Sequence, residues 1–217
     1  MLFLEVRLSY LQVVALATTC ATRSELREFL PASITFGGRV TETSRSPLLP
    51  GPVRQLGYVV ADIDAAMRSW IRLGVGPWYV LRALPQRARY RGAPCDVVVT
   101  VAFAHSGDLQ LELIQQEDET PSIYTEFLGD GPGGFHQLAW WSTDFEATVE
   151  AVRAAGYESV WSGGSDGGVR YAYFEPRDEI ATVLEISEYT DSTAGLARML
   201  RAAADGWDGD DPIRTLG

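Results

Sequence analysis

Cysteine and histidine are both scarce in this chain. Its 217 residues include two cysteines, Cys20 and Cys95, and two histidines, His105 and His136. The cysteines lie in unrelated contexts without Cys-x-x-Cys spacing, which excludes a disulfide framework. Two histidines are too few for a zinc site built from several imidazoles. The low cysteine content fits a reducing compartment, and we expect a cytoplasmic protein.

Positive charge is also in short supply. Lysine and arginine total 18 against 29 acidic residues, so the net charge is -11. An acidic surface repels phosphate backbones, and we therefore expect no nucleic acid partner. Hydrophobic residues make up 46% of the chain and charged residues 22%, as in soluble globular proteins with a core. We expect no nucleotide cofactor.

No apolar run is long enough to cross a membrane. The longest, Leu8–Ala21, falls short of the roughly 20 residues that a spanning helix needs. Read as a signal peptide, the segment would use Arg7 as its basic part, but Glu5 argues against that interpretation. We favour a marginal helix or residues added by an upstream start codon. Residues 1–50 are thus interpreted as an extension and linker, in part disordered or not native.

An internal repeat organises the rest of the chain. Gln55–Met67 and Gln137–Val149 both run Gln-Leu, four strand-like residues, one small residue, Asp and then a helical pattern. Such a segment predicts a strand followed by a helix. The aspartates, Asp62 and Asp144, are typical helix N-caps because they accept hydrogen bonds from free backbone N–H groups.

Further strand candidates follow each predicted helix. The helices are expected to end at Gly74 and Gly156. The strand candidates that come next are Trp78–Leu84, Val97–His105 and Leu109–Gln115 in the first half, and Glu158–Trp161, Val169–Phe174 and Thr182–Ser187 in the second. Each half therefore has the order β-α-β-β-β. A short helix over Pro121–Leu128, with Ser122 near its start, is expected to join the halves.

The repeat predicts an α+β protein. We place a paired domain at residues 51–190, with modules at about 53–116 and 135–188. Ser192–Ala204 reads as a helix, so residues 191–217 form a C-terminal helix and an acidic tail.

Each half ends on an apolar strand that contains one carboxylate. Glu112 lies within Leu111–Ile114, and Glu185 lies within Leu184–Ile186. Side chains alternate across a strand, so each glutamate points away from its apolar neighbours, toward solvent or toward a cavity. Two glutamates at equivalent positions of a repeated unit favour a shared role in one cavity.

Together these segments resemble the vicinal-oxygen-chelate superfamily, which contains glyoxalase I, methylmalonyl-CoA epimerase, extradiol dioxygenases and bleomycin-resistance proteins. The resemblance covers about Val53–Tyr189, and the pattern is most like the glyoxalase and epimerase branch. The segments that carry it are Gln55–Met67, Leu73–Trp78, Leu109–Ile114, Gly133–Trp140 and Tyr173–Ile186. It implies that the two βαβββ modules form a curved mixed sheet around a single cleft, the glyoxalase-like fold.

The resemblance also implies a metal site. The family holds its metal with one residue from the first strand and one from the last strand of each half, here Gln55, Glu112, Gln137 and Glu185. Both first-strand positions are glutamine where the family usually has histidine. An all-oxygen set favours Mg, Mn, Co or Ca over Zn. A β-bulge would exchange Gln137 for His136; we take Gln137 as the aligned residue and His136 as a candidate for the pocket wall.

Three functions fit the resemblance. The first is an isomerase, epimerase or lyase in which the metal stabilises an enolate and Glu112 or Glu185 takes a proton from the carbon next to a carbonyl. The second is a metal-free protein that sequesters a ligand in the same cleft. The third is a metal-free tailoring enzyme with Glu112 or Glu185 as a plain base. Dioxygenase activity is disfavoured because that iron site uses two histidines and a carboxylate.

Aromatic residues near the predicted strands suggest a bulky or ring-containing substrate. Trp141 shares a face with Gln137 and should line the site. The other expected substrate contacts are His136, Tyr58, Tyr124, Tyr173 and Arg89. Arg89 belongs to an arginine cluster that we expect to lie mainly on a solvated loop, with an anion clamp as the alternative. A complete site in each chain is expected, and a homodimer is left open.

Overall fold

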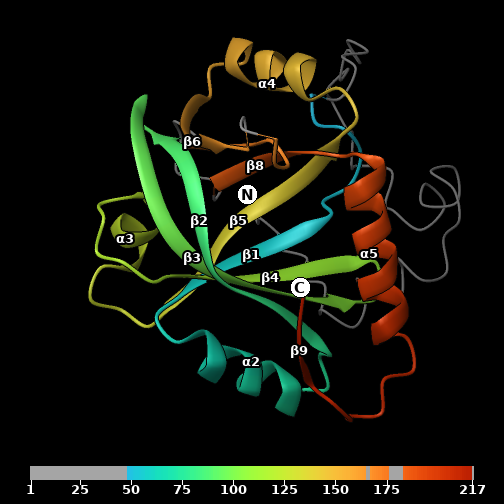
Figure 1. Ribbon diagram of the computed structural model, residues 1–217. Helices are drawn as coiled ribbons and strands as arrows, with labels where there is room; N and C mark the ends of the chain where they lie inside the picture. Colours follow the sequence, from blue (N-terminus) through green and yellow to red (C-terminus); the bar gives the residue numbers. More distant parts are fainter. Residues whose placement is uncertain (1–47, 165–166, 176–182, 217) are drawn as a thin grey trace, which may run out of the picture. The chain divides into compact units, whose positions relative to one another are not determined.

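The structure is a computed structural model that describes residues 48–164, 167–175 and 183–216. All of these lie in the unit Arg45–Gly217. The interpretation of residues 1–47 lies outside the described residues. Figure 1 shows an α+β unit built on a curved mixed sheet, which confirms the expected fold class. No described helix is long and apolar enough to span a membrane.

The predicted β-α-β-β-β order is confirmed in both halves. The first half contains β1 (Gln55–Val60), α2 (Ile63–Arg72), β2 (Trp78–Tyr90), β3 (Ala93–Ser106) and β4 (Leu109–Gln116). The second half contains β5 (Gly133–Ser142), α4 (Phe145–Ala154), β6 (Glu158–Gly163), β7 (Tyr171–Glu175) and β8 (Val183–Glu188). The elements outside the repeat are α3 (Ile123–Leu128), α5 (Asp191–Ala204) and β9 (Ile213–Thr215).

Helix boundaries follow the predicted capping signals. The Asp62 carboxylate accepts a hydrogen bond from the Ala65 backbone nitrogen at 2.8 Å. Asp144 does the same for Ala147 at 3.2 Å. Beyond the last turns, Gly74 and Gly156 have φ values of 81° and 97°, the left-handed region that glycine adopts without strain.

The hairpin of β2 and β3 is longer than predicted. The expected strand ended at Leu84, but β2 continues to Tyr90 and pairs with β3 as far as Ala93. The arginine-rich segment that was expected to be a loop is therefore a strand. Within it, the exposed Arg87 and Arg89 flank Ala88, which is buried and packs against Cys95 across the hairpin. Strands alternate in this way between exposed and buried residues, but the many arginines obscure the alternation in the sequence.

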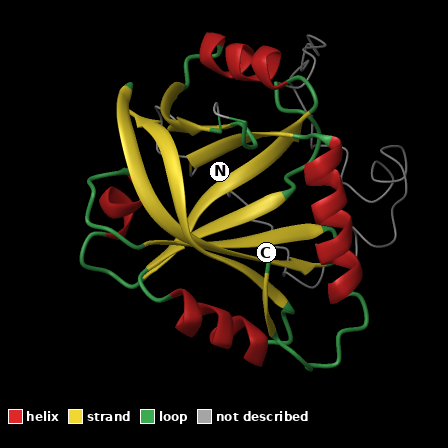
Figure 2. Cartoon of the chain, in the orientation of Figure 1, coloured by secondary structure: helices red, strands yellow, loops and turns green. Residues whose placement is uncertain are grey.

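The described strands form one nine-stranded sheet in the order β3-β4-β1-β5-β8-β7-β6-β2-β9. The first and last strands of each half are parallel neighbours, β1 with β4 and β5 with β8. The halves meet along the antiparallel pair β1 and β5. Because β2 pairs with both β3 and β6, the sheet closes on itself (Figure 2).

The helices of the repeat cover the outer face of this sheet (Figure 1). On α2, Ile63 and Met67 pack in a cluster with Leu111 and Leu113 of β4. The corresponding cluster under α4 includes Leu184 and Ile186 of β8, among others. The apolar neighbours of both glutamates thus point outward beneath a helix, which directs the glutamates to the inner face.

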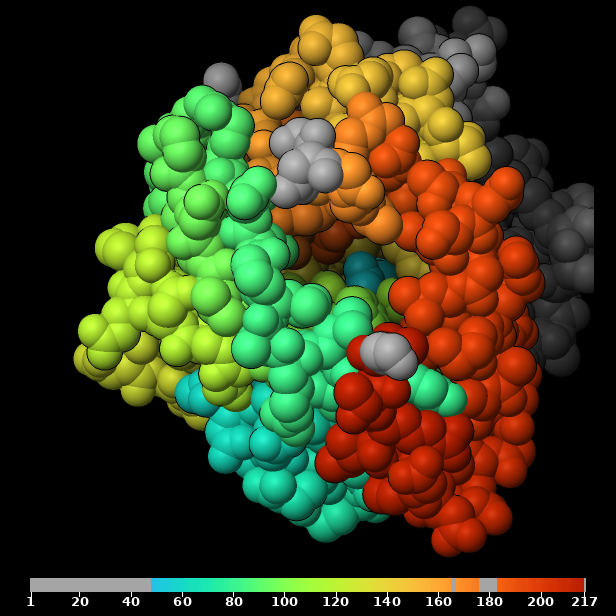
Figure 3. Space-filling model, in the orientation of Figure 1, coloured from blue at the N-terminus to red at the C-terminus, as the bar shows by residue number. Residues whose placement is uncertain are grey.

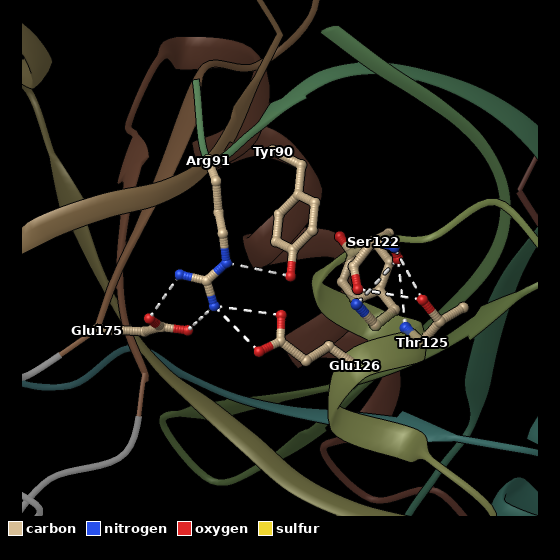
Figure 4. A network of polar contacts seen from close by, with 7 residues as sticks. Tyr90, Arg91, Ser122, Thr125, Glu126 and Glu175 are labelled. Atoms are coloured by element: carbon tan, nitrogen blue, oxygen red, sulfur yellow. Dashed lines mark hydrogen bonds and ion pairs between the residues drawn. The ribbon is translucent and has the colours of Figure 1, made fainter. Parts of the chain in front are cut away.

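An exposed ion-pair network ties the tip of the long hairpin to the second half (Figure 4). Arg91, which follows β2, lies 3.1 Å from a Glu126 carboxylate oxygen on α3 and 3.2 Å from a Glu175 oxygen on β7. The partners are exposed, so the network contributes at most about 1 kcal/mol to stability. It helps to position α3, which carries Tyr124 on the inner side of the sheet.

Candidate active site

The inner face of the sheet borders a cavity of about 440 Å³. In Figure 3 a hollow opens between β2 and α5, with atoms of β1 at its bottom. Its apolar lining comes from both halves and from α5: Leu81, Leu84, Pro85, Val99, Val101, Phe103, Ile114, Trp141, Val169 and Leu196. The polar lining includes both glutamates, Glu112 and Glu185. The cavity is therefore apolar with a polar, acidic patch.

Gln137 joins the two glutamates. Its side chain has no exposed surface. The amide nitrogen Nε2 donates to Glu112 Oε2 at 3.3 Å and to Glu185 Oε2 at 3.4 Å. The same nitrogen lies 3.1 Å from the Tyr173 hydroxyl. One amide group from the second half thus brings a carboxylate of each half within hydrogen-bond distance of a single nitrogen.

A β-bulge and a glycine shape this contact. On β1, Gly57 pairs with Gln137, but the next residue, Tyr58, pairs with Phe135, so His136 is an extra residue in β5. The bulge predicted as an alternative is present, and both His136 and Gln137 are buried. The His136 ring nitrogen Nδ1 contacts Gln137 Oε1. His136 stands behind Gln137 and does not replace it.

Burial sets the protonation of the carboxylate pair. The pKa of Glu112 is raised well above its usual value, first by burial and then by the nearby Glu185. Burial also raises the pKa of Glu185, to about 7, although hydrogen bonds from Ser187 and Gln137 oppose the shift. At neutral pH the pair therefore retains at least one proton. It can both donate and accept a proton.

Gln55 has a different partner. Its Nε2 donates to Gln110 Oε1 at 2.8 Å, and Gln110 Nε2 lies 3.5 Å from His105 Nε2. Burial lowers the pKa of His105, so its ring is neutral and accepts from the amide. Gln55 and Gln110 both line the cavity. Gln110 was not predicted, although it precedes Glu112 by two positions and so shares its face of β4.

Most of the predicted site residues lie at this cavity. The predicted residues that line it are Gln55, Glu112, Tyr124, Trp141, Tyr173 and Glu185. Gln137 and His136 are buried directly behind the glutamates. Further lining residues, outside the predicted site set, are Gln86, Tyr171, Ser187, Glu188, Thr193 and Leu196.

Two predicted substrate contacts lie elsewhere. Tyr58 is on the outer face, with its ring centroid 5.6 Å from those of Trp70 and Phe135. It follows Gly57 directly, and neighbouring residues of a strand face opposite sides. Arg89 is exposed and donates to the Gly92 carbonyl oxygen. From the same arginine cluster, Arg87 lines the cavity.

A family comparison agrees with the fold. The family model described as the glyoxalase, bleomycin resistance protein and dioxygenase superfamily matches residues 54–174. The chain belongs to this superfamily. The superfamily includes enzymes that act on small molecules, and divalent metals are common among its members. No curated protein matches the chain. Strand β8, helix α5 and strand β9 lie beyond the matched segment.

Solved structures of similar fold include two epimerases. Methylmalonyl-CoA epimerase from Mycobacterium tuberculosis is 21% identical, with 70% of this chain and 95% of that chain covered and a TM-score of 0.48. A Streptomyces coelicolor methylmalonyl-CoA epimerase variant in complex with 2-nitronate-propionyl-CoA is 16% identical, covering 64% and 95%, with a TM-score of 0.48. A hypothetical protein from Bacillus halodurans is 18% identical, covering 64% and 95%, with the same score.

The donor atoms between the glutamates do not fit a divalent ion in this arrangement. A metal ligand needs an available lone pair, whereas Gln137 presents N–H groups to Glu112 and Glu185. The amide oxygen of Gln137 is directed to His136 instead. The described part of the chain contains no group of three or more His, Cys, Asp or Glu residues suited to a metal.

Proposed function

We propose that this protein is an isomerase, epimerase or lyase that moves a proton at the carbon next to a carbonyl group of a small molecule. The observation that carries the proposal is the carboxylate pair: Glu112 and Glu185 come from corresponding strands of the two halves and line one cavity. Both are within hydrogen-bond distance of Gln137 Nε2, at 3.3 and 3.4 Å. A proton donor and a proton acceptor are thus adjacent.

In the proposed reaction Glu185 acts as the base. Its carboxylate oxygen forms an O–H bond as the substrate C–H bond breaks, and the electron pair moves onto the carbonyl oxygen to give an enolate. The protonated Glu112 returns a proton to the carbon, which completes an epimerisation or isomerisation; in a lyase, loss of a leaving group follows instead. A raised pKa makes a carboxylate a better base near neutral pH.

Two buried tyrosines are suited to the developing negative charge. Tyr124 and Tyr173 both line the cavity. Burial raises the pKa of each hydroxyl, so both keep their protons at neutral pH. A neutral O–H donor in a cavity with little water stabilises an enolate oxygen more than it would in bulk solvent.

The cavity supports a bulky, largely apolar substrate. A volume of about 440 Å³ accommodates a drug-sized molecule, and a small dicarbonyl would leave most of it empty. The lining is mainly aliphatic and aromatic, with Trp141 on one wall. A carboxylate or phosphate on the substrate would meet Arg87 at the cavity lining.

Hydrogen exchange tests the proposal without a known substrate. The protein is incubated in D2O with a panel of ring-containing ketones and 2-substituted acyl thioesters, and deuterium at the carbon next to the carbonyl is measured by mass spectrometry. We expect incorporation that falls at least about 100-fold in Glu112→Gln and Glu185→Gln. Glu150→Gln, an exposed change on α4, is the matched control. Incorporation that persists in both glutamine variants would contradict the proposal.

The apolar lining also favours a second candidate, a protein that sequesters a ligand without chemistry. In that case panel compounds raise the melting temperature but take up no deuterium. The metal-assisted form of the reaction, with Mg, Mn, Co or Ca held by Gln55, Glu112, Gln137 and Glu185, requires the Gln137 amide to turn its oxygen to the carboxylates. Metal analysis of protein purified without chelators, with Glu112→Ala and Glu185→Ala as comparisons, tests that form.

A further inference from the structure

We propose that the Gln137 amide group takes the place between Glu112 and Glu185 that a divalent ion has in metal-dependent relatives, and that Gly57 provides the room for it. The site is then built to hold its two carboxylates together without a metal. This inference rests on the same carboxylate pair as the proposed function, but its tests need no substrate.

The surroundings of the Gln137 nitrogen are those of a cation site. Its Nε2 has oxygens of Glu112, Glu185 and Tyr173 at 3.3, 3.4 and 3.1 Å. An amide oxygen at this point would repel ionised carboxylates, whereas an amide N–H group carries a partial positive charge toward them. The Gln137 amide therefore holds the two carboxylates together by hydrogen bonds, where an ion would hold them by coordination.

His136 fixes which way the amide points. Its Nδ1 contacts Gln137 Oε1, and because an amide oxygen only accepts hydrogen bonds, Nδ1 is the donor of this contact. With its oxygen held by His136, the Gln137 amide has its Nε2 directed at the carboxylates. The bulge in β5 places both residues on the inner side of the sheet. The extra residue of the bulge, His136, thus orients the Gln137 amide.

The absence of a side chain at Gly57 leaves the space that the Gln137 side chain occupies. A Cβ atom at position 57 would lie 2.2 Å from Gln137 Cδ, much closer than any van der Waals contact allows. Since β1 lies between β4 and β5, Gln137 has to cross β1 to reach Glu112. Only a glycine at this position leaves the crossing open. The three features, glycine, bulge and amide, belong to one arrangement.

Cobalt binding is the first test. Wild-type protein, Gln137→His and the double variant Gln137→His with Glu185→Gln are titrated with Co²⁺ and followed by visible absorption. We expect no saturable binding by wild-type protein, about one Co²⁺ per chain in Gln137→His, and loss of that binding in the double variant. Wild-type protein that binds Co²⁺ as well as Gln137→His, or a Gln137→His variant that binds none, overturns the proposal.

Coupling between Gly57 and Gln137 is the second test. Gly57→Ala alone should lower the melting temperature by about 5 °C or more, because the new methyl group collides with Gln137. In a Gln137→Ala background the same change should cost far less. Gly134→Ala is the matched control, since a Cβ there meets nothing within 4 Å. Equal costs of Gly57→Ala in both backgrounds overturn the proposal.

The two proposals fail separately. Absence of deuterium exchange together with the expected cobalt and melting results removes the proposed reaction and leaves the role of Gln137 intact. If wild-type protein exchanges deuterium but binds Co²⁺ as tightly as Gln137→His does, the proposed reaction stands and the role of Gln137 is removed.

Discussion

The two halves of this protein carry the same residue at corresponding positions and use it differently. Gln55 on β1 donates to Gln110 and stays at the cavity wall, while Gln137 on β5 crosses to both glutamates. The residue that faces each glutamine across the β1 and β5 pair explains the difference: Gln137 faces Gly57, whereas Gln55 faces Ala139. One methyl group, together with the bulge at His136, breaks the symmetry of the repeat.

The largest expected effect concerns which half carries the base. We predict that Glu185→Gln lowers the rate of deuterium incorporation by about 10²- to 10⁴-fold and that Glu112→Gln lowers it less. The charge of Glu185 raises the pKa of Glu112, so Glu185 is the carboxylate of the pair that ionises first. Initial rates at pH 7.5 for both variants check the order. A reversed order would place the base in the first half, and equal losses would contradict the assignment of the base to Glu185.

Adding a carboxylate should affect the two glutamine positions unequally. Gln137→Glu puts a third carboxyl group beside the buried pair and should destabilise the protein by about 3–5 kcal/mol at pH 7.5. Gln55→Glu, at the cavity wall and next to a neutral amide, should cost on the order of 1 kcal/mol. Urea denaturation of both variants measures the two values. Similar costs would mean that the surroundings of Gln55 and Gln137 do not differ in the way that their contacts indicate.

The carboxylate pair should also make stability depend on pH. The folded protein raises the pKa of Glu185 to about 7, so the folded state binds this proton more tightly than the unfolded chain does. The stability present below about pH 4.5 is then lost as the pH rises through 7. Glu185→Gln should be more stable than wild type by about 1–3 kcal/mol at pH 8, with no such gain at pH 4.5. Thermal unfolding across this range measures the difference; a gain that is the same at both pH values would contradict it.

The smallest effect is expected at the outer junction of the halves. Arg91→Met removes the contacts to Glu126 and Glu175 and should cost less than about 1 kcal/mol, with the cost shrinking in high salt. Denaturation at low and at high salt, with Arg68→Met on α2 as the control, checks this. A cost of several kcal/mol would show that the contacts at the hairpin tip contribute as much to the free energy of unfolding as those of the buried site.

Much of the fold was predictable because it depends on local patterns. The strand and helix order follows from periodicity and from the aspartate caps, which the structure bears out. The inward direction of Glu112 and Glu185 follows from alternation along a strand that is apolar on its other face. The location of the protein in the cytoplasm, homodimer formation and the preferred metal stay predictions.

The rest depends on contacts between distant segments. Nothing near Gln137 in the sequence indicates that Gly57 lies opposite it, because their pairing is set by the register of β1 and β5. The bulge at His136 has no local sequence signal, and its presence decides how both residues point. Tyr58 was expected in the pocket for its aromatic character alone, although its position next to Gly57 directs it outward.

Helix α5 gives this site a wall from outside the two repeated modules. Thr193 and Leu196 line the cavity, and both follow β8, the last strand of the second module. The proton-transfer groups therefore belong to the repeat, whereas part of the enclosure that selects for size and shape comes from a helix that follows it. Such a wall can diverge freely, and substitutions along it can change which molecules are accepted while the chemistry at the bottom of the cavity stays the same.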